Sequence, residues 1–251
     1  MPITLIEQFP KEKRIPQDSS RQLQISELFG DTIQGEITPF PATFLRLKNC
    51  TLACTWCDTL AVWKAGNPYS INELLQIFEE NGFIERFREG QHLILTGGSP
   101  LMQQDALVDF IHLFIIKHGF KPFIEVENEA VLIPSQAFIK LVDVWNNSPK
   151  LENSGMKLRA RYKPEAIASV AQLPNSFFKF VVDNDNDWNE IKISYLDCSL
   201  IRKDQIVLMP QGQTREELQV SYEATVNMCV KHNIRFSDRT HVTIWNKQTG
   251  V

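Results

Sequence analysis

The sequence predicts an α/β fold in which parallel strands alternate with helices. Short apolar runs rich in β-branched and aromatic residues recur from Phe44 onward, and segments with helical spacing of apolar residues separate them. Six or seven strands fall short of the eight that close a barrel, so we expect an incomplete β/α barrel or a doubly wound sheet. Either architecture places functional residues at the carboxyl ends of the strands.

The predicted strands are bounded by polar turns and begin after an irregular N-terminal segment. Residues 1–24 mix charges with prolines and show no sustained period, so we expect an extension that precedes a single domain over residues 25–251. The strand segments are ATFLRLKN (42–49), HLILTGG (92–98), KPFIEVEN (121–128), LVDVWNNS (141–148), FFKFVVD (177–183), QIVLMPQ (205–211) and HVTIWN (241–246).

Helix signals lie between these strands. The Ser70 to Glu73 and Thr214 to Glu217 segments fit a capping box, in which a hydroxyl and an acid three residues later satisfy backbone amides. Apolar residues at helical spacing predict a helix over residues 105–119 that ends at Gly119. KPEAIASVAQ (163–172) begins with a proline in the first turn, and DNDNDWNE (183–190) is predicted as a solvated loop that enters a helix.

Composition limits the functional classes. Hydrophobic residues make up 43% of the 251 residues, which supports a packed core, and 26 Lys and Arg oppose 30 Asp and Glu. This balance does not suggest a basic surface for nucleic acid, and no stretch approaches the ~20 apolar residues of a membrane span. We therefore expect a cytoplasmic protein that binds neither nucleic acid nor membranes, in a compartment where clustered cysteines bind metal or act in catalysis.

Three cysteines close together predict an open metal site. Cys50, Cys54 and Cys57 fall within eight positions, and no fourth ligand follows at a typical spacing. Structural zinc sites use four protein ligands, whereas a site that also binds substrate leaves a position open. Cys198 and Cys229 stand alone in the sequence and are predicted to be small buried hydrophobic residues.

Polar and glycine-rich segments stand where the predicted strands end. The three-cysteine segment follows the first of these strands, and the later strands end in TGGSP, EVEN, NNSPK and MPQG. Paired glycines let backbone approach a ligand closely because no Cβ intervenes. Since parallel strands share one carboxyl edge, we expect these segments to surround one site.

The cysteine spacing C-x3-C-x2-C, followed by TGGSP after the next strand, resembles the radical S-adenosylmethionine superfamily. The resemblance implies a partial β/α barrel of the radical S-adenosylmethionine type, in which three thiolates hold a 4Fe-4S cluster. The fourth iron would bind the amino and carboxylate groups of S-adenosylmethionine. Further stretches resemble the 7-carboxy-7-deazaguanine synthase family over nearly the whole chain: FGDTIQGE (29–36), FLRLKNCTLACTWCDT (44–59), NSPKLENSGM (147–156), FKFVV (178–182) and MPQGQT (209–214).

This family resemblance implies a carbon–nitrogen lyase of queuosine and 7-deazapurine biosynthesis. The reaction would convert 6-carboxy-5,6,7,8-tetrahydropterin to 7-carboxy-7-deazaguanine with loss of ammonia. A 5′-deoxyadenosyl radical would abstract hydrogen, so no side chain is predicted to be catalytic in that step. The resemblance also implies Mg²⁺, an external electron donor of the flavodoxin or ferredoxin type, and a homodimer.

The resemblance assigns roles by position. Cys50, Cys54 and Cys57 match the cluster ligands, while Thr59 matches a magnesium ligand that Asp58 would orient. The positions that match substrate-binding residues are Gln34, Glu36, Arg46 and His241, the last approaching from the final predicted strand. The positions that match the S-adenosylmethionine pocket are Gly97, Gly98, Ser99, Glu125, Ser148, Lys150 and Gln211.

Two departures from the usual patterns leave parts of this assignment open. Many superfamily members have an acid at the position of Ser99, so the contact with the amino group here is predicted to use backbone carbonyls. EVENEA replaces the commoner Glu-Thr-Asn-Gly, which leaves open whether Glu125 or Glu127 faces the cofactor. Alternation along a strand points both acids to the same side.

Two other functions fit parts of the sequence. A glycyl-radical enzyme activase shares the cysteine spacing, but IQGE at 33–36 and CDT at 57–59 favour the pterin. A zinc-binding module without catalysis needs a fourth ligand such as His92 or His112, and neither is near the cysteines in sequence.

Overall fold

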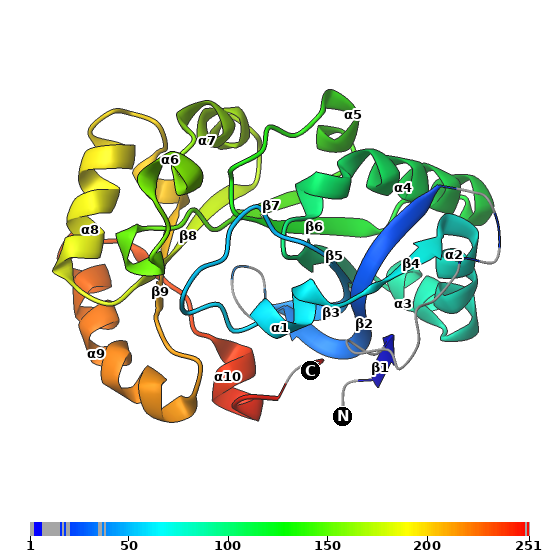
Figure 1. Ribbon diagram of the computed structural model, residues 1–251, viewed down its shortest axis with the longest axis horizontal. Coiled ribbons are helices and arrows are strands. Elements are labelled where there is room, and N and C mark those ends of the chain that lie inside the picture. The colour runs from blue at the N-terminus through cyan, green and yellow to red at the C-terminus, as the bar shows by residue number, and fades with distance from the viewer. Residues whose placement is uncertain are drawn as a thin grey trace.

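A computed structural model describes residues 3–6, 16, 18, 21–34, 37, 39–248 and 250. Its centre is a run of neighbouring parallel strands (Figure 1). In sheet order they are β3 (Phe40–Leu47), β5 (His92–Gly97), β6 (Phe123–Asn128), β7 (Val144–Asn147), β8 (Ser176–Val182) and β9 (Ile206–Pro210). Chain order and sheet order agree, as expected for successive crossovers of one hand.

Further strands extend both edges of this sheet. β2 (Gln22–Gln34) pairs antiparallel with β3, and both β1 (Ile3–Ile6) and β4 (Asn67–Ser70) pair with β2. β10 (Arg235–Phe236) lies parallel to β9 at the other edge. The edge strands β1 and β10 do not pair with each other in the described part of the chain. The sheet is therefore an open, partial barrel, which confirms the predicted fold class.

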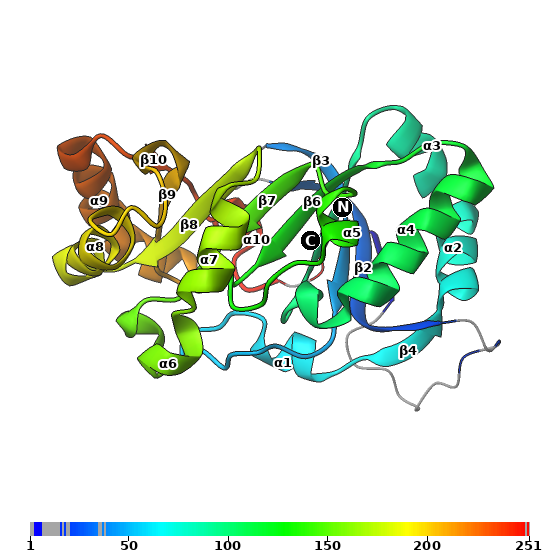
Figure 2. The ribbon, with the colours of Figure 1, turned by 90° about the horizontal axis from the view of Figure 1, so that it is seen from above.

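Helices cover the outer face of the sheet. Figures 1 and 2 show α2, α3 and α4 beyond one end of the sheet and α8 and α9 beyond the other. The α-helices are α1 (Leu60–Lys64), α2 (Ile71–Glu80), α3 (Phe83–Arg88), α4 (Gln104–His118), α5 (Gln136–Ile139), α6 (Leu158–Arg161), α7 (Pro164–Ala171), α8 (Asp185–Ile191), α9 (Arg215–His232) and α10 (Thr240–Trp245). Among the described residues, no helix is both long and apolar enough to cross a membrane.

Strand alternation separates the core from the barrel interior. Leu93 and Leu95 of β5, like Ile124 and Val126 of β6, belong to one cluster of buried apolar side chains shared with the helices. Successive strand residues point to opposite faces, so the residues between them face the interior. That inner face carries polar groups, and the site is built on it.

Most predicted elements are confirmed, with shifts of a few residues at their ends. The six strand segments between residues 42 and 211 correspond to β3 and β5 to β9. Ser70 and Glu73 form the complete capping box of α2, and α4 stops at Gly119 with φ of 77°. At α9 the Thr214 hydroxyl accepts a hydrogen bond from the Glu217 amide at 3.1 Å.

The predicted strand at residues 241–246 is wrong. This segment is helix α10, with i to i+4 backbone hydrogen bonds of 3.0 Å from Thr243 to Arg239 and 2.8 Å from Asn246 to Val242. A short apolar run with β-branched residues suits a buried helix as well as a strand. β10 occupies the edge of β9 in its place.

Within the predicted extension at residues 1–24, Ile3–Ile6 form β1 and Gln22 begins β2. Both strands pair within the sheet. The sequence expectation did not include these strands, and the division of the chain into an extension and one domain stays a prediction.

Candidate active site

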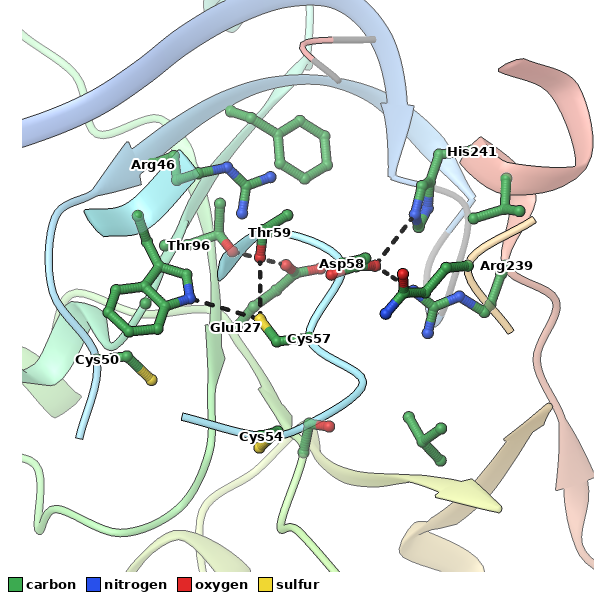
Figure 3. Close-up of a pocket in the computed structure, with 18 of the residues that line it drawn as sticks. Arg46, Cys50, Cys54, Cys57, Asp58, Thr59, Thr96, Glu127, Arg239 and His241 are labelled. Atoms are coloured by element: carbon green, nitrogen blue, oxygen red, sulfur yellow. Dashed lines mark hydrogen bonds and ion pairs between the residues drawn. The ribbon is translucent and has the colours of Figure 1, made fainter. Parts of the chain in front are cut away.

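A cavity of about 400 Å³ opens at the carboxyl ends of the parallel strands. Residues from the inner face of the sheet, the loop after β3 and helix α10 line it. Figure 3 shows the three cysteines to one side of Asp58 and the pair Arg239 and His241 to the other. The strand ends therefore meet at one site, as the α/β architecture predicts.

The three cysteines Cys50, Cys54 and Cys57 are free thiols that all line this cavity. The Leu52 amide donates to Cys50 Sγ at 3.4 Å, and Trp63 Nε1 donates to Cys57 Sγ at 3.5 Å (Figure 3). Hydrogen bonds to sulfur stabilise thiolates and tune the potential of any iron they hold.

Contacts with the loop after β7 hold the cysteine loop in place. Trp56 Nε1 donates to the Asn153 carbonyl at 3.0 Å, and the Thr55 amide donates to the Ser154 carbonyl at 3.0 Å. These bonds join segments that are far apart in sequence, since Trp56 and Asn153 are separated by 97 residues. The position of the thiols is therefore a tertiary property.

The paired glycines after β5 allow close backbone packing. A Cβ on Gly97 would lie 2.4 Å from the Leu47 carbonyl oxygen, and one on Gly98 would lie 2.0 Å from the Asn49 carbonyl oxygen. Gly97 also has φ of 144°, which side chains disfavour. Both glycines line the cavity, whereas Ser99 is fully buried beside it.

The donor set fits an iron–sulfur cluster. Burial, followed by the Glu129 carboxylate, raises the pKa of the Cys50 thiol to about 12, and burial also raises the pKa of Cys54. These thiols lose their protons when a cation replaces them, as soft metal sites require. In the described part of the chain, no three Asp, Glu, Cys or His side chains lie close enough together to bind one metal ion. An iron–sulfur cluster does not require such a group, because each thiolate binds a different iron atom.

Neither histidine proposed as a zinc ligand reaches the cysteines. His92 is buried, with Nδ1 2.6 Å from Glu125 Oε1, and it stacks on Phe40 and Phe123 at centroid distances of 4.4 and 4.2 Å. His112 is exposed on α4. Neither side chain lines the cavity, so the geometry does not favour a four-ligand zinc site.

Asp58 joins the cysteine loop to the C-terminal helix. Its carboxylate forms an ion pair with Arg239, and His241 Nε2 lies 3.7 Å from Asp58 Oδ2. Burial opposes ionisation of Asp58, but the charge of Arg239, followed by the His241 contact, outweighs it and lowers the pKa of the carboxyl. Asp58 thus remains an anion in neutral solution. Thr59 lines the cavity beside it, with Oγ1 3.7 Å from Cys57 Sγ.

Arg46 lies on the inner face of β3 and lines the cavity. Its Nε donates to Glu27 Oε2 at 2.9 Å, and the two side chains are only 14% and 2% exposed. Arg46 was predicted from its position in the sequence as a substrate contact, and its partner on β2 was not predicted. The pair fixes the guanidinium and leaves its remaining N–H groups toward the cavity (Figure 3).

Glu127, and not Glu125, is the carboxylate that faces the cavity. Thr96 Oγ1 donates to Glu127 Oε2 at 2.8 Å, and both residues line the cavity (Figure 3). Glu125 points to the same side of β6 but lies two residues deeper, fully buried against His92 and Asn146. Strand alternation therefore correctly placed both acids on the same side of β6, and only their depth in the barrel decides which one reaches the cavity.

The other predicted residues fall into three groups. Ser148 and Lys150 line the cavity, with Lys150 Nζ donating to Ser148 Oγ at 2.7 Å. Gln211 does not line it, and Gln213 from the same loop does. The Gln34 backbone belongs to β2, but its side chain and the whole of Glu36 lie outside the described residues.

Several cavity residues were missed from sequence. The buried polar residues among them are Glu27, Thr96, Asn128, Glu129, Asn146, Lys179 and Arg239. The residues on strands could have been found from the sequence. A polar residue within an apolar strand costs free energy to bury unless it has a partner, so such a residue indicates a site. Lys179 in FFKFVV is the clearest case. Glu129 and Arg239 lie in loops, where sequence periodicity does not predict the direction in which a side chain points.

Lys179 is expected to make stability depend on pH. Burial, followed by the Arg239 charge, lowers the pKa of its ammonium group from 10.5 to about 7. Between these values the unfolded chain binds more protons than the folded one, so stability should rise with pH across that window. Lys179→Met should flatten the rise. Urea unfolding of the metal-free protein at several pH values would measure it, and equal slopes in both proteins would contradict the expectation.

The fold and the site define a partial β/α barrel of the radical S-adenosylmethionine type. No protein-family profile matches the sequence. The chain is similar to the 7-carboxy-7-deazaguanine synthase of Koribacter versatilis, with 36% identity over 170 residues that cover 66% of this chain and 67% of the relative. A similar comparison with the 7-carboxy-7-deazaguanine synthase of Pyrobaculum aerophilum gives 28% identity over 233 residues, or 91% of this chain and 97% of the relative.

The fold has a counterpart among solved structures. The crystal structure of QueE from Escherichia coli matches with a TM-score of 0.63 and 22% identity, over 87% of this chain and 94% of the other. The chain belongs to the 7-carboxy-7-deazaguanine synthase family.

Proposed function

We propose that this protein is a 7-carboxy-7-deazaguanine synthase, a radical S-adenosylmethionine lyase. The substrate would be 6-carboxy-5,6,7,8-tetrahydropterin, and the products 7-carboxy-7-deazaguanine and ammonia. The observation that carries the proposal is one cavity that joins three free thiols to Thr59 and Arg46. Membership in the family supports the same reaction. A cavity of about 400 Å³ suits small ligands, which favours a pterin over the protein substrate of an activase.

The proposed cofactors are a 4Fe-4S cluster on Cys50, Cys54 and Cys57, S-adenosylmethionine, and Mg²⁺ at Thr59. The cluster would supply the electron that cleaves S-adenosylmethionine and so begins the reaction. The thiols are sufficiently exposed to the cavity for ligation, and Trp63 and Leu52 already donate to their sulfurs. Gly97 and Gly98 allow S-adenosylmethionine to approach the strand ends closely.

The chain's own residues would bind and orient the substrate. Arg46 presents N–H groups suited to a carboxylate, and its bond to Glu27 holds the guanidinium in one orientation. Thr59 would bind Mg²⁺ through its hydroxyl, with Asp58 held in place by Arg239. The hydroxyl of Thr96 and the carboxylate of Glu127 add polar contacts on the cavity wall.

The remaining proposals concern the cellular setting. We propose an external electron donor of the flavodoxin or ferredoxin type, as the family resemblance implies. We also propose a homodimer, the commonest assembly of enzymes. A cytoplasmic location would keep five free thiols and an iron–sulfur cluster reduced.

Anaerobic turnover tests the function directly. The protein would be reconstituted with iron and sulfide and supplied with reductant, S-adenosylmethionine, Mg²⁺ and the pterin. Chromatography with mass detection should show 7-carboxy-7-deazaguanine and ammonia. Cleavage of S-adenosylmethionine with an unchanged pterin would assign a different substrate, and a protein that takes up zinc but no iron would reject the proposal.

Thr59→Ala is expected to weaken the binding of Mg²⁺ without disturbing the cluster. The hydroxyl is a proposed ligand, while Oγ1 lies 3.7 Å from Cys57 Sγ and makes at most a weak contact with it. The Mg²⁺ concentration for half-maximal rate should rise by about tenfold, the lower end of losses at metal sites. Thr59→Ser keeps the hydroxyl and is the matched control. An identical Mg²⁺ titration for Thr59→Ala would remove the assignment.

A further inference from the structure

Glu129 is a buried carboxylate at the wall of the cavity, and its two oxygens differ. Oε1 accepts hydrogen bonds from Thr51 Oγ1 at 2.5 Å and Ser99 Oγ at 2.7 Å. Oε2 is buried and has no hydrogen-bond partner among the described residues. The residue as a whole is 4% exposed and lines the cavity. One half of the carboxylate is thus satisfied by the protein and the other half is not.

A buried anionic oxygen without a partner is unfavourable, because it has lost water and gained nothing in return. Native proteins seldom retain such an atom unless a ligand supplies the missing donor. The nearby Lys150 donates instead to Ser148 at 2.7 Å. The partner of Oε2 is therefore expected to be an N–H or O–H donor that enters the cavity with a ligand.

The backbone around Glu129 fixes where that donor would lie. Asn128 Oδ1 accepts from the Ala130 amide at 2.7 Å, and Ala130 has φ of 55°, so the chain turns sharply at Glu129. Asn128 Nδ2 in turn donates to Asn147 Oδ1 at 2.9 Å. These bonds tie the turn to β7 and restrict the directions in which the Glu129 side chain can point.

Glu129 also contacts both segments expected to surround S-adenosylmethionine. Thr51 follows Cys50 directly, and Ser99 follows the glycine pair. A Cβ on Gly98 would lie 2.7 Å from the Cys50 Cβ, so these segments meet. A donor on Oε2 would consequently sit between the cysteine loop and the glycine pair.

We propose that Glu129 Oε2 accepts a hydrogen bond from the α-amino group of S-adenosylmethionine, and that Ser99 and Thr51 orient this carboxylate. The inference rests on the proposed function. Many superfamily members carry an acid at the position of Ser99, where this chain has a hydroxyl. Here the acid stands at position 129, where the commoner Glu-Thr-Asn-Gly segment has Asn. The two substitutions compensate each other, because the carboxylate reaches the same corner of the cavity from β6 in place of β5.

Ligand binding without turnover tests this assignment. Cluster-loaded protein without reductant would be titrated calorimetrically with S-adenosylhomocysteine and with its analogue that lacks the α-amino group. Because the amine would also contact the open iron, both proteins should prefer the ligand that carries it. The preference should be about 10- to 100-fold larger in wild-type protein than in Glu129→Gln, the range for hydrogen bonds to charged groups. The double variant Ser99→Glu with Glu129→Asn should recover the larger preference, since it returns the carboxylate to the position common in the superfamily.

Two controls separate this role from general damage. Glu80→Gln removes an exposed carboxylate on α2 and should keep the wild-type preference. Iron content and the visible absorbance of each variant would verify cluster loading. Equal weakening of both ligands by Glu129→Gln would overturn the inference and leave the proposed function standing. Failure of cluster-loaded wild-type protein to bind either ligand would overturn both.

Discussion

Cys54→Ala is expected to abolish iron loading and product formation together. Cys54 is buried and lines the cavity, whereas Cys198 and Cys229 do not line it and so cannot take its place. With only Cys50 and Cys57 remaining, iron per chain after anaerobic reconstitution should fall from about four to below about one. Iron and sulfide assays, together with product formation, would measure both losses.

The two remaining cysteines provide matched controls for this experiment. Cys198 is exposed, contrary to the expectation that it is buried, and its Sγ donates to the Ser194 carbonyl at 2.9 Å. Cys229 is buried as expected and does not line the cavity. Cys198→Ala should load iron normally. Full iron in Cys54→Ala would show that the cluster, if present, is held elsewhere.

Arg46→Ala is expected to lower the free energy of unfolding by about 3–5 kcal/mol, as breaking one half of a buried ion pair does. Glu27, at 2% exposure, would keep a negative charge without its partner. The same substitution should raise KM for the pterin, because Arg46 is a proposed carboxylate contact. Urea unfolding and steady-state kinetics would measure the two effects separately.

A double variant distinguishes these two roles of Arg46. Glu27→Gln with Arg46→Ala removes both charges, so most of the lost stability should return. The raised KM should remain, because the guanidinium is still absent. Recovery of KM together with stability would show that Arg46 acts only through the fold. Loss of S-adenosylmethionine cleavage in the same proportion as pterin affinity would point to the same conclusion.

The element pattern was largely readable from sequence because local rules decide it. The capping box at Ser70 and the glycine at 119 end helices through groups close in the chain. Strands such as residues 123–128 can be predicted from their amino-acid composition. The long strand β2 and the helix at residues 240–245 were missed or misassigned, because pairing with distant partners determines their state.

The site followed the same division. The spacing of Cys50, Cys54 and Cys57 and the glycine pair indicated an open metal site, and further stretches resembled the family, which the relatives confirm. The roles of individual substrate and cofactor contacts stay predictions. Glu127, Gln213 and Glu129 could not be chosen over their neighbours from sequence, since exposure to the cavity depends on depth along a strand and on the path of a loop.

The sequence by itself determined the α/β class and the group of three cysteines, because periodicity and close spacing are local properties, and its resemblance over nearly the whole chain indicated the family. Only the tertiary structure decided that Glu27 pairs with Arg46, that Asp58 meets Arg239, and that Glu129 keeps one oxygen unpaired at the cavity. These contacts join residues 19, 181 and 30 positions apart, the last between Glu129 and Ser99. Contacts over such separations form only when the whole sheet assembles, and no local pattern records them.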